Sequence, residues 1–193
     1  MTSLAKPVRP IRLYRAGLSG HAYSIELFLS LLFLPFEVID VDLANGQQRT
    51  PEYLPTNPSG QVPVIDDSGF VLHDSDAILA YLARTYGEGH WMPTDTASEA
   101  KVQHWLTVLG LSLDHVRTRA ISKTLFDVLE PQLAARDFAL GDQATVADIA
   151  AYTYVAHAPE GGIDMAPYPA IRGWLSRVEA LPGFVPIQKQ EQS

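Results

Sequence analysis

Residues 57–86 read NPSGQVPVIDDSGFVLHDSDAILAYLARTY, and this stretch decides how the first half of the chain folds. The apolar run at 62–65 predicts a buried strand, residues 66–69 a hairpin turn, and residues 70–72 the partner strand. Apolar residues then recur at helical spacing over 75–86, which predicts a helix. Two strands followed by a helix are typical of a small α/β domain.

The residues upstream of this stretch predict a strand, a helix and a second strand. The strands are expected at 11–15 and 36–43, and the helix at 22–34, where Pro35 stops it. This order favours a right-handed crossover and a parallel strand pair. The polar residues 44–60 are long enough for an irregular helix and a turn.

The second half of the chain has helical periods and no strand signals. Thr96 with Glu99 and Thr145 with Asp148 each form a Thr-x-x-acid pattern, which predicts a capping box at a helix start. Pro131 is expected to interrupt the helix that precedes it. The residues expected on buried helix faces are Val102, Trp105, Leu106, Leu109, Ile121, Leu125, Val128, Leu129, Val146, Ile149, Ala150, Thr153, Ile171, Trp174, Leu175 and Val178.

The two halves are separated by GEGHWMPTDTAS, residues 87–98, which is rich in small residues and turn formers. We interpret this segment as a linker. The sequence therefore predicts an α/β domain at residues 8–87 and an all-α domain at residues 97–193.

Composition and charge exclude several classes of function. The chain has 193 residues, of which 47% are hydrophobic, enough for a sizeable core. Its 14 Lys and Arg against 22 Asp and Glu give a net charge of −8, which disfavours a nucleic-acid partner. With 0 cysteines, the chain has no disulfide, no Cys-ligated zinc and no Cys nucleophile.

The sequence also lacks the signals of a membrane or exported protein. The longest strongly apolar segment, residues 27–36, is far short of the ~20 residues that span a bilayer. The N-terminal residues show no export signal, because Arg12 and Arg15 interrupt any apolar region. We therefore expect no membrane partner and a cytoplasmic location.

Pro63 is the first candidate functional residue. Because proline cannot donate to a sheet ladder, Pro63 marks either an ordinary strand edge or a place where the backbone is left free. If the Val62–Pro63 bond is cis, Val62 can turn its N–H and C=O outward to receive an extended, peptide-like ligand. Both interpretations are open on this segment alone.

Asp74 and Ser75 stand at the start of the helix predicted at 75–86. The free N–H groups of a helix N-terminus suit a ligand carboxylate, and Asp74 suits an ammonium group. Together they could hold an amino-acid zwitterion. The alternative is plain N-capping of the helix by Asp or Ser.

Ser19 lies between the first strand and the first helix. Its hydroxyl and the neighbouring backbone N–H groups could stabilise an anion such as a thiolate. Lowering a thiol pKa by two units needs roughly 2.7 kcal/mol, which one hydrogen bond and a helix end can supply. The alternative is that Ser19 and Gly20 only form the loop.

Taken together, these motifs resemble those of a known family, the soluble, two-domain glutathione S-transferases of the bacterial-like, cytosolic type. The resemblance rests on LYRAGLSGHAYSIELFL, NPSGQVPVI, LHDSDAILAYLARTYG and GDQATVADIAAY, in the expected order and spacing. It covers nearly the whole chain. It implies a thioredoxin-like α/β domain that holds glutathione and an all-α domain that supplies most of an apolar pocket for the electrophile.

The resemblance implies that seven residues bind glutathione: Gln48, Arg49, Gln61, Val62, Pro63, Asp74 and Ser75. Val62 would pair its backbone with the cysteinyl unit, and Pro63 would be the cis-proline. Asp74, which replaces the more usual Glu with a shorter arm, would grip the γ-glutamyl end together with Ser75.

Gln48 and Arg49 would lie against the glycine carboxylate, and Gln61 would help. Arg49 is the better physical match to a carboxylate, because its guanidinium can form two parallel hydrogen bonds. Ser19 aligns with the position that carries serine, threonine or cysteine in the non-tyrosine classes. It would be the catalytic residue and would stabilise the glutathione thiolate.

Other activators of the thiol are weighed against Ser19. Tyr14 is expected in the core of the first strand, and Tyr23 early in the first helix. His21 is near enough to tune the site, although a lone loop histidine is more often only solvated. A serine-hydrolase site, a metal site and a nucleotide site are disfavoured, because their motifs are missing.

The resemblance predicts a detoxifying transferase that conjugates glutathione, as co-substrate, to a small apolar electrophile, and a homodimer. Two alternatives are a glutathione-dependent peroxidase or disulfide reductase without a protein thiol, and a non-catalytic glutathione-fold binding module. The second alternative is suggested by Asp74 and by a helical hairpin at 105–145 that is shorter than expected of relatives.

Overall fold

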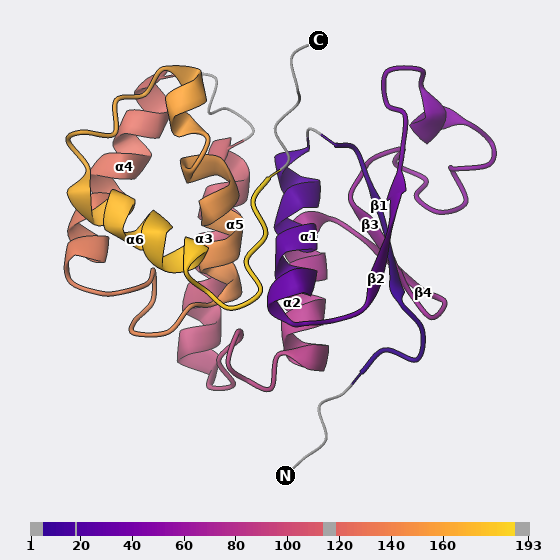
Figure 1. Cartoon of the computed structure of the whole chain (residues 1–193), viewed down its shortest axis with the longest axis horizontal. Helices are drawn as coiled ribbons and strands as arrows, with labels where there is room; N and C mark the ends of the chain where they lie inside the picture. The colour runs from indigo at the N-terminus through magenta and orange to yellow at the C-terminus, as the bar shows by residue number, and fades with distance from the viewer. Residues whose placement is uncertain (1–5, 18, 114–118, 188–193) are drawn as a thin grey trace. The chain divides into compact units, whose positions relative to one another are not determined.

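The computed structural model describes residues 6–17, 19–113 and 119–187, with the backbone only for 108–113 and 119–124. The chain forms two compact units, Met1–Leu82 with Pro182–Ser193 and Ala83–Leu181. Figure 1 follows the elements of each unit along the chain.

The first unit holds a four-stranded mixed sheet. The strands are β1 (Ile11–Arg15), β2 (Phe36–Asp40), β3 (Val64–Asp67) and β4 (Phe70–His73), in the order β2-β1-β3-β4. β1 pairs parallel with β2 and antiparallel with β3, and β3 pairs antiparallel with β4. The expected parallel pair and the expected hairpin are therefore both confirmed.

Two helices cover one face of this sheet, α1 (Gly20–Leu31) and α2 (Ser75–Tyr86) (Figure 1). Alternation along β1 buries Ile11 and Leu13 completely. Between β2 and β3 the chain forms a short 3₁₀ helix, η1 (Gln47–Arg49). The opposite face of the sheet carries a small apolar cluster of Val41, Tyr53 and Val64 with Tyr14 and Val62 packed against it.

The predicted bounds of three elements in the first unit were wrong by two or three residues. The helix expected at 22–34 is Gly20–Leu31, because Ser19 caps it earlier and the chain turns left-handed at Phe33, with φ of 52°. The strand expected at 36–43 ends at Asp40, and the strand expected to start at residue 62 starts at Val64, after the proline.

The last described residues return to the first unit. The Ser30 hydroxyl donates to the Gly183 carbonyl at 2.6 Å, and the Tyr23 hydroxyl donates to the Val185 carbonyl at 2.7 Å. Gly183 has φ of 89°, and an added Cβ would lie 2.7 Å from the Ser30 carbonyl oxygen, so only glycine allows this approach. The segment after the last helix thus packs on α1.

The second unit is all helical in its described part. It holds α3 (Thr96–Leu113), α4 (Arg119–Ala134), α5 (Val146–Val155) and α6 (Pro169–Glu179), with a short 3₁₀ helix η2 (Ala158–Gly161). The predicted core residues Val102, Leu106, Ile149, Trp174 and Val178 are fully or almost fully buried. An α/β thioredoxin-like domain and an all-α domain were the expected fold class, and this is confirmed.

Some predictions for the second unit were wrong. Asp95, and not Thr96, caps α3, since its carboxylate accepts the Ser98 N–H at 2.9 Å, while Glu99 forms an ion pair with Arg84. Pro131 does not end α4, which continues to Ala134. Val128 was expected on the buried face of α4 but is 48% exposed. Side chains 108–124, which include Leu109 and Ile121, lie outside the described detail.

Asp148 is the polar centre of the second unit. Its carboxylate is completely buried and accepts hydrogen bonds from the N–H groups of Ala139 (2.8 Å) and Thr145 (2.9 Å) and from the Trp174 indole (2.9 Å). Burial raises the pKa of Asp148, while these hydrogen bonds oppose the rise. The predicted Thr145–Asp148 capping box therefore also joins α5 to α6.

We predict that Asp148→Ala destabilises the second unit by roughly 3–5 kcal/mol, because it leaves buried N–H donors unpaired. Urea unfolding of the full chain measures this loss. Asp142→Ala is the matched control: Asp142 is exposed, and its loss should cost less than about 0.5 kcal/mol. Equal stabilities of the two variants would contradict the role of Asp148.

Candidate functional site

The topology of the sheet brings the candidate residues to one edge. β3 runs antiparallel to β1, and Tyr14 pairs with Val64, so Val62 lies beside the segment that follows Arg15. β4 returns antiparallel to β3, and Val64 pairs with His73, which places Asp74 at the same edge. β2 runs parallel to β1 and ends there too. Segments far apart in sequence therefore meet around the start of α1.

Val62 offers a free backbone at this edge. The Val62–Pro63 peptide bond is cis, and β3 begins only at Val64. Within the described residues no hydrogen bond occupies the Val62 N–H or C=O. An extended ligand can therefore pair with Val62 in the manner of an added strand.

A buried amide holds the loop that leads to Val62. Asn57 is 1% exposed, and its Oδ1 accepts hydrogen bonds from the Ser59 N–H (3.0 Å) and hydroxyl (2.8 Å). Its Nδ2 donates to the Gln61 carbonyl at 2.9 Å, and the Tyr53 hydroxyl donates to the same carbonyl at 2.8 Å. Sequence reasoning assigned no role to Asn57 or Tyr53. The only signal was the turn-forming Asn-Pro-Ser-Gly run.

Gln48 and Arg49 in η1 lie against this loop. Gly60 has φ of 64°, and a Cβ there would lie 2.9 Å from the Gln48 carbonyl oxygen and 3.9 Å from Arg49 Cγ. Arg49 is exposed, and within the described residues it forms no ion pair. The Gln48 Oε1 atom is buried without a hydrogen-bond partner there. Gln61 is also exposed. The three residues expected to bind a carboxylate, Gln48, Arg49 and Gln61, therefore lie on two neighbouring segments, η1 and the loop before Val62.

Asp74 and Ser75 begin α2, as predicted. Asp74 has φ of 78°, and its Oδ1 accepts the N–H groups of Asp76 (3.1 Å) and Ala77 (3.0 Å). The capping interpretation of Asp74 is therefore confirmed. Its Oδ2 has no hydrogen bond in the described part of the chain, and the residue is exposed.

Ser19 is the N-cap of α1. Its Oγ accepts the Ala22 N–H at 3.2 Å, and its own N–H donates to the Ala16 carbonyl at 2.9 Å. A hydroxyl that accepts a hydrogen bond still has a proton to donate. Ser19 can therefore cap the helix and donate to an anion in front of it.

The two tyrosines have other contacts. Tyr23 is 6% exposed, and its hydroxyl donates to the Val185 carbonyl. Tyr14, which was expected in the core, is only half-buried, and it packs edge to face on Tyr53 with ring centroids 6.3 Å apart. Burial and the neighbouring Tyr14 raise the pKa of Tyr53 to about 12, so its phenol stays protonated and keeps donating to Gln61.

A contact between His21 and Ser75 joins the starts of α1 and α2, and Asp76 lies beside it. The sequence did not predict either feature. His21 Nδ1 and Ser75 Oγ lie 3.1 Å apart in a hydrogen bond, so His21 is not a merely solvated loop residue. Burial, and next the charge of Asp74, raise the pKa of Asp76 to about 6, against the opposing effect of His21. A titrating carboxyl thus lies next to Ser75.

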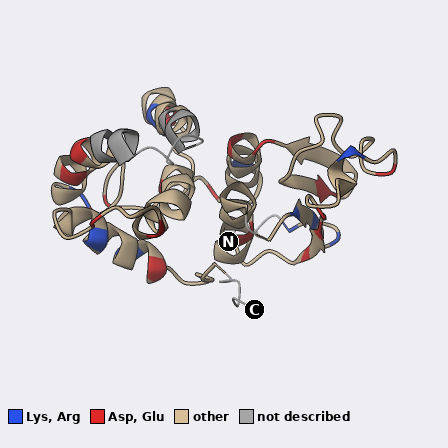
Figure 2. Cartoon of the chain, turned by 90° about the horizontal axis from the view of Figure 1, so that it is seen from above, with Lys and Arg blue, Asp and Glu red and all other residues tan. Residues whose placement is uncertain are grey.

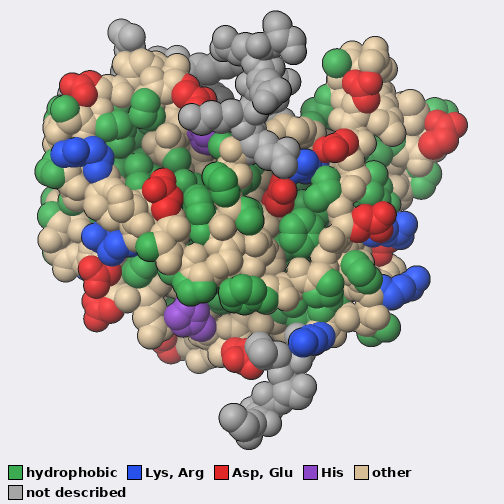
Figure 3. Space-filling model, in the orientation of Figure 1, with side chains coloured by type: hydrophobic (Ala, Val, Ile, Leu, Met, Phe, Trp, Pro, Cys, Tyr) green, Lys and Arg blue, Asp and Glu red, His purple; other side chains and the backbone are tan. Residues whose placement is uncertain are grey.

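Charge at the surface is mixed. Lys and Arg are spread over several elements (Figure 2), and the face in Figure 3 intersperses acidic, basic and apolar side chains. In the described ranges no group of three His, Asp or Glu side chains could hold a metal ion. Among the same residues, every helix is too short or too polar to cross a membrane.

Comparisons with known proteins follow this geometry. The family described as "Glutathione S-transferase, N-terminal domain" matches residues 9–84, and "Glutathione S-transferase, C-terminal domain" matches residues 118–182. Glutathione S-transferase theta-1 of Rattus norvegicus is 31% identical, covering 90% of this chain and 84% of its own. Glutathione S-transferase 3 of Zea mays is 32% identical, covering 91% of each.

Solved structures of glutathione S-transferases are also similar to this chain. The crystal structure of a glutathione S-transferase from Pseudomonas fluorescens superposes with a TM-score of 0.86 at 29% identity, covering 94% of this chain and 100% of that one. A possible glutathione S-transferase from Rhodopseudomonas palustris gives a TM-score of 0.85 at 33% identity, with the same coverage.

We predict that Asp76→Asn stabilises the chain at pH 8 but not at pH 4. The folded pKa of about 6 lies above the ordinary value of 3.8, so ionisation in the fold is unfavourable. The contribution of Asp76 to the free energy of unfolding is therefore highest below pH ~4 and falls as the pH rises through ~6. Because Asp76 is partly solvated, screening reduces the gain at pH 8 to roughly 1–2 kcal/mol. Urea unfolding at both pH values measures it, and a gain that does not change with pH would contradict the assignment.

Proposed function

The chain belongs to the glutathione S-transferase family, and from this premise we propose how it binds glutathione and conjugates it to an apolar electrophile. As a member of the family it is a glutathione transferase, with glutathione as its co-substrate. The observation that carries the proposal is the free backbone of Val62, at the edge of the sheet where β1 leads toward Ser19 and β4 leads to Asp74. Arg49 lies against Gly60, two residues before Val62.

We propose that glutathione lies along Val62 as a short added strand. The Val62 N–H donates to the cysteinyl carbonyl, and the Val62 C=O accepts the cysteinyl N–H. Pro63 has no N–H that would compete for this ligand. Tyr53 and Asn57 support the arrangement, because they fix the Gln61 carbonyl next to Val62.

The two ends of the tripeptide meet groups of complementary charge. Asp74 Oδ2 accepts from the γ-glutamyl ammonium, while the Ser75 hydroxyl and the Ser75 N–H at the start of α2 donate to its α-carboxylate. Arg49 meets the glycine carboxylate in a charge-assisted pair, with Gln48 and Gln61 beside it. His21 orients the Ser75 hydroxyl through their 3.1 Å contact.

Ser19 acts on the sulfur. Its hydroxyl donates to the thiolate while the N-terminal end of α1 adds positive potential, and both favour ionisation of the thiol. The thiol proton leaves to solvent. The sulfur then forms a bond to the electrophilic carbon, and the displaced bond gives its electron pair to the leaving group. With 0 cysteines in the chain, no protein disulfide forms on this route.

The finer expectations stay predictions of this proposal. They are the homodimer, the cytoplasmic location, the domain limits 8–87 and 97–193, and the detoxifying role. The bacterial-like subclass is also a prediction, because plant, rat and bacterial relatives match at similar identity, from 29% to 33%. The names of these relatives favour conjugation over the peroxidase, reductase and binding-module alternatives.

We predict that Ser19→Ala lowers kcat for conjugation about 10- to 100-fold, since a hydrogen bond to a charged sulfur is lost. The KM for glutathione should change less than about threefold, because the peptide ends keep their contacts. The pKa of bound glutathione, measured from thiolate absorbance against pH, should rise. Ser19→Thr keeps the hydroxyl and should retain most of the activity. Full activity with an unchanged thiol pKa in Ser19→Ala would rule out this role.

We predict that Arg49→Gln raises the KM for glutathione about 10-fold through the lost carboxylate pair. The control is a change in the ligand: γ-glutamylcysteine lacks the glycine, so its KM should be the same in the wild type and the variant. If both ligands lose affinity equally, Arg49 does not contact the glycine carboxylate. Steady-state kinetics with one fixed electrophile distinguishes these results.

A further inference from the structure

The segment that follows α6 packs along α1, the helix at the proposed thiolate site. Residues 182–187, here called the return segment, lie beside α1 in Figure 1, and both belong to the first unit. The Ser30 hydroxyl donates to the Gly183 carbonyl at 2.6 Å. The Tyr23 hydroxyl donates to the Val185 carbonyl at 2.7 Å. Two side chains of α1 therefore hold the backbone of the return segment.

Tyr23 and Ser30 make these two contacts from one face of α1. They are about two helical turns apart, so their side chains lie in one row along the helix. The return segment therefore runs from the C-terminal end of α1, at Ser30, toward its N-terminal end, at Tyr23. It packs closely there, because a Cβ on Gly183 would lie 2.7 Å from the Ser30 carbonyl oxygen.

Tyr23 is also bonded directly to Ser19. The Tyr23 N–H donates to the Ser19 carbonyl at 2.9 Å, in the first turn of α1. In the same turn, the Ala22 N–H donates to the Ser19 Oγ atom at 3.2 Å. Tyr23 is 6% exposed, so the surrounding protein holds its ring. One residue therefore connects the return segment, through its side chain, with Ser19, through its backbone.

The first turn of α1 has little support of its own. Helix ends fray, because their first N–H groups have no partner within the helix. This turn begins with Gly20, which allows the backbone many conformations, and it contains no acidic residue that would interact favourably with the helix dipole. Apart from the Ser19 cap, the contact between Tyr23 and the return segment is what holds it.

The Tyr23 phenol acts on the sulfur only indirectly. A tyrosine hydroxyl has one proton to donate, and the Tyr23 hydroxyl donates it to the Val185 carbonyl. It therefore does not donate to a glutathione thiolate at the same time. Any effect of Tyr23 on the sulfur has to pass through the position of Ser19.

We propose that Tyr23 is a positioning residue for conjugation: held by the return segment, it fixes the Ser19 hydroxyl in front of the glutathione sulfur. This inference rests on the proposed role of Ser19. A hydrogen bond weakens steeply as its angle departs from linear, and a donor stabilises developing charge best when it is already in place. Without the Tyr23 contact, the first turn of α1 frays and the thiolate loses stabilisation. Asp74 and Arg49 still hold the ends of the peptide, so glutathione continues to bind.

The test compares the two hydroxyls that hold the return segment. Tyr23→Phe removes only the hydroxyl, and we expect it to lower kcat about fivefold and to change the KM for glutathione less than about twofold. The pKa of the bound thiol, measured from thiolate absorbance against pH, should rise by about 0.5. Ser30→Ala is the matched control at the far end of α1, and it should behave as the wild type in all three measurements. An unchanged thiol pKa in Tyr23→Phe, or an equal rise in Ser30→Ala, would overturn the proposal.

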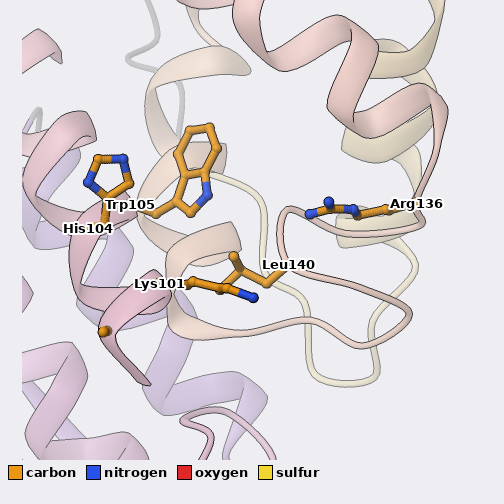
Figure 4. A pocket seen from close by; sticks show the side chains of 6 residues that line it. Lys101, His104, Trp105, Arg136 and Leu140 are labelled. Atoms are coloured by element: carbon orange, nitrogen blue, oxygen red, sulfur yellow. The ribbon is translucent and has the colours of Figure 1, made fainter. Parts of the chain in front are cut away.

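Two further variants separate positioning from a general loss of stability. Leu140→Ala truncates a half-buried side chain at a pocket of the second unit (Figure 4). It should lower the midpoint of urea unfolding and leave the thiol pKa unchanged. Gly183→Ala pushes the return segment away from Ser30, and it should raise the thiol pKa although Tyr23 keeps its hydroxyl. The double variant of Gly183→Ala and Tyr23→Phe should show no larger rise than the stronger single variant. Fully additive rises, or a raised pKa in Leu140→Ala, would contradict the proposal.

The role of Tyr23 and the proposed role of Ser19 fail in different ways. Amide hydrogen exchange of Ala22 and Tyr23, followed by NMR without glutathione, reports the stability of the first turn alone. Tyr23→Phe should speed this exchange about tenfold, and Ser30→Ala should not. If the exchange does not change, Tyr23 does not hold the turn. If Ser19→Ala raises the thiol pKa and Tyr23→Phe does not, only the role of Tyr23 is wrong. If Ser19→Ala leaves the thiol pKa unchanged, the role of Ser19 is wrong, and the positioning role fails with it.

Discussion

The side chain of Asn57 is the constraint on which the proposed glutathione site depends. It is almost fully buried, and its three short hydrogen bonds to Ser59 and Gln61 replace the solvent contacts that a buried amide loses. These bonds shape the loop that ends at Val62, so the backbone of Val62 stays outside the sheet ladder. A strand that paired one residue earlier would use the groups that the ligand needs.

Several residues of the proposed site also stabilise the fold. Ser19 and Asp74 each use one acceptor to cap a helix, which leaves the Ser19 proton and the second Asp74 oxygen for the proposed contacts with glutathione. A change at either residue therefore affects helix stability and binding together. Separating the two effects needs conservative variants that keep the cap, because loss of activity alone reports both.

The sequence predicted the strands, α2 and the place of most candidate residues, because these depend on local patterns. It predicted neither the contact between His21 and Ser75, which are 54 residues apart, nor the burial that perturbs Asp76. These features exist only after antiparallel pairing brings the starts of α1 and α2 together. The predicted start of α1 was two residues late, because the apolar run begins only at Ala22 and does not show that the Ser19 hydroxyl caps the helix.

Because the chain has a net charge of −8, an anionic tripeptide can bind only where nearby positive groups outweigh the overall repulsion. At physiological ionic strength, exposed charges more than about 8 Å apart are largely screened. In the proposed site the ligand therefore interacts mainly with nearby groups: the N–H groups at the starts of two helices, Arg49, and the Asp74 carboxylate for its ammonium group. Overall acidity excludes an extended polyanion, which would cover many surface charges, and leaves small anions free to bind where the chain concentrates its donors.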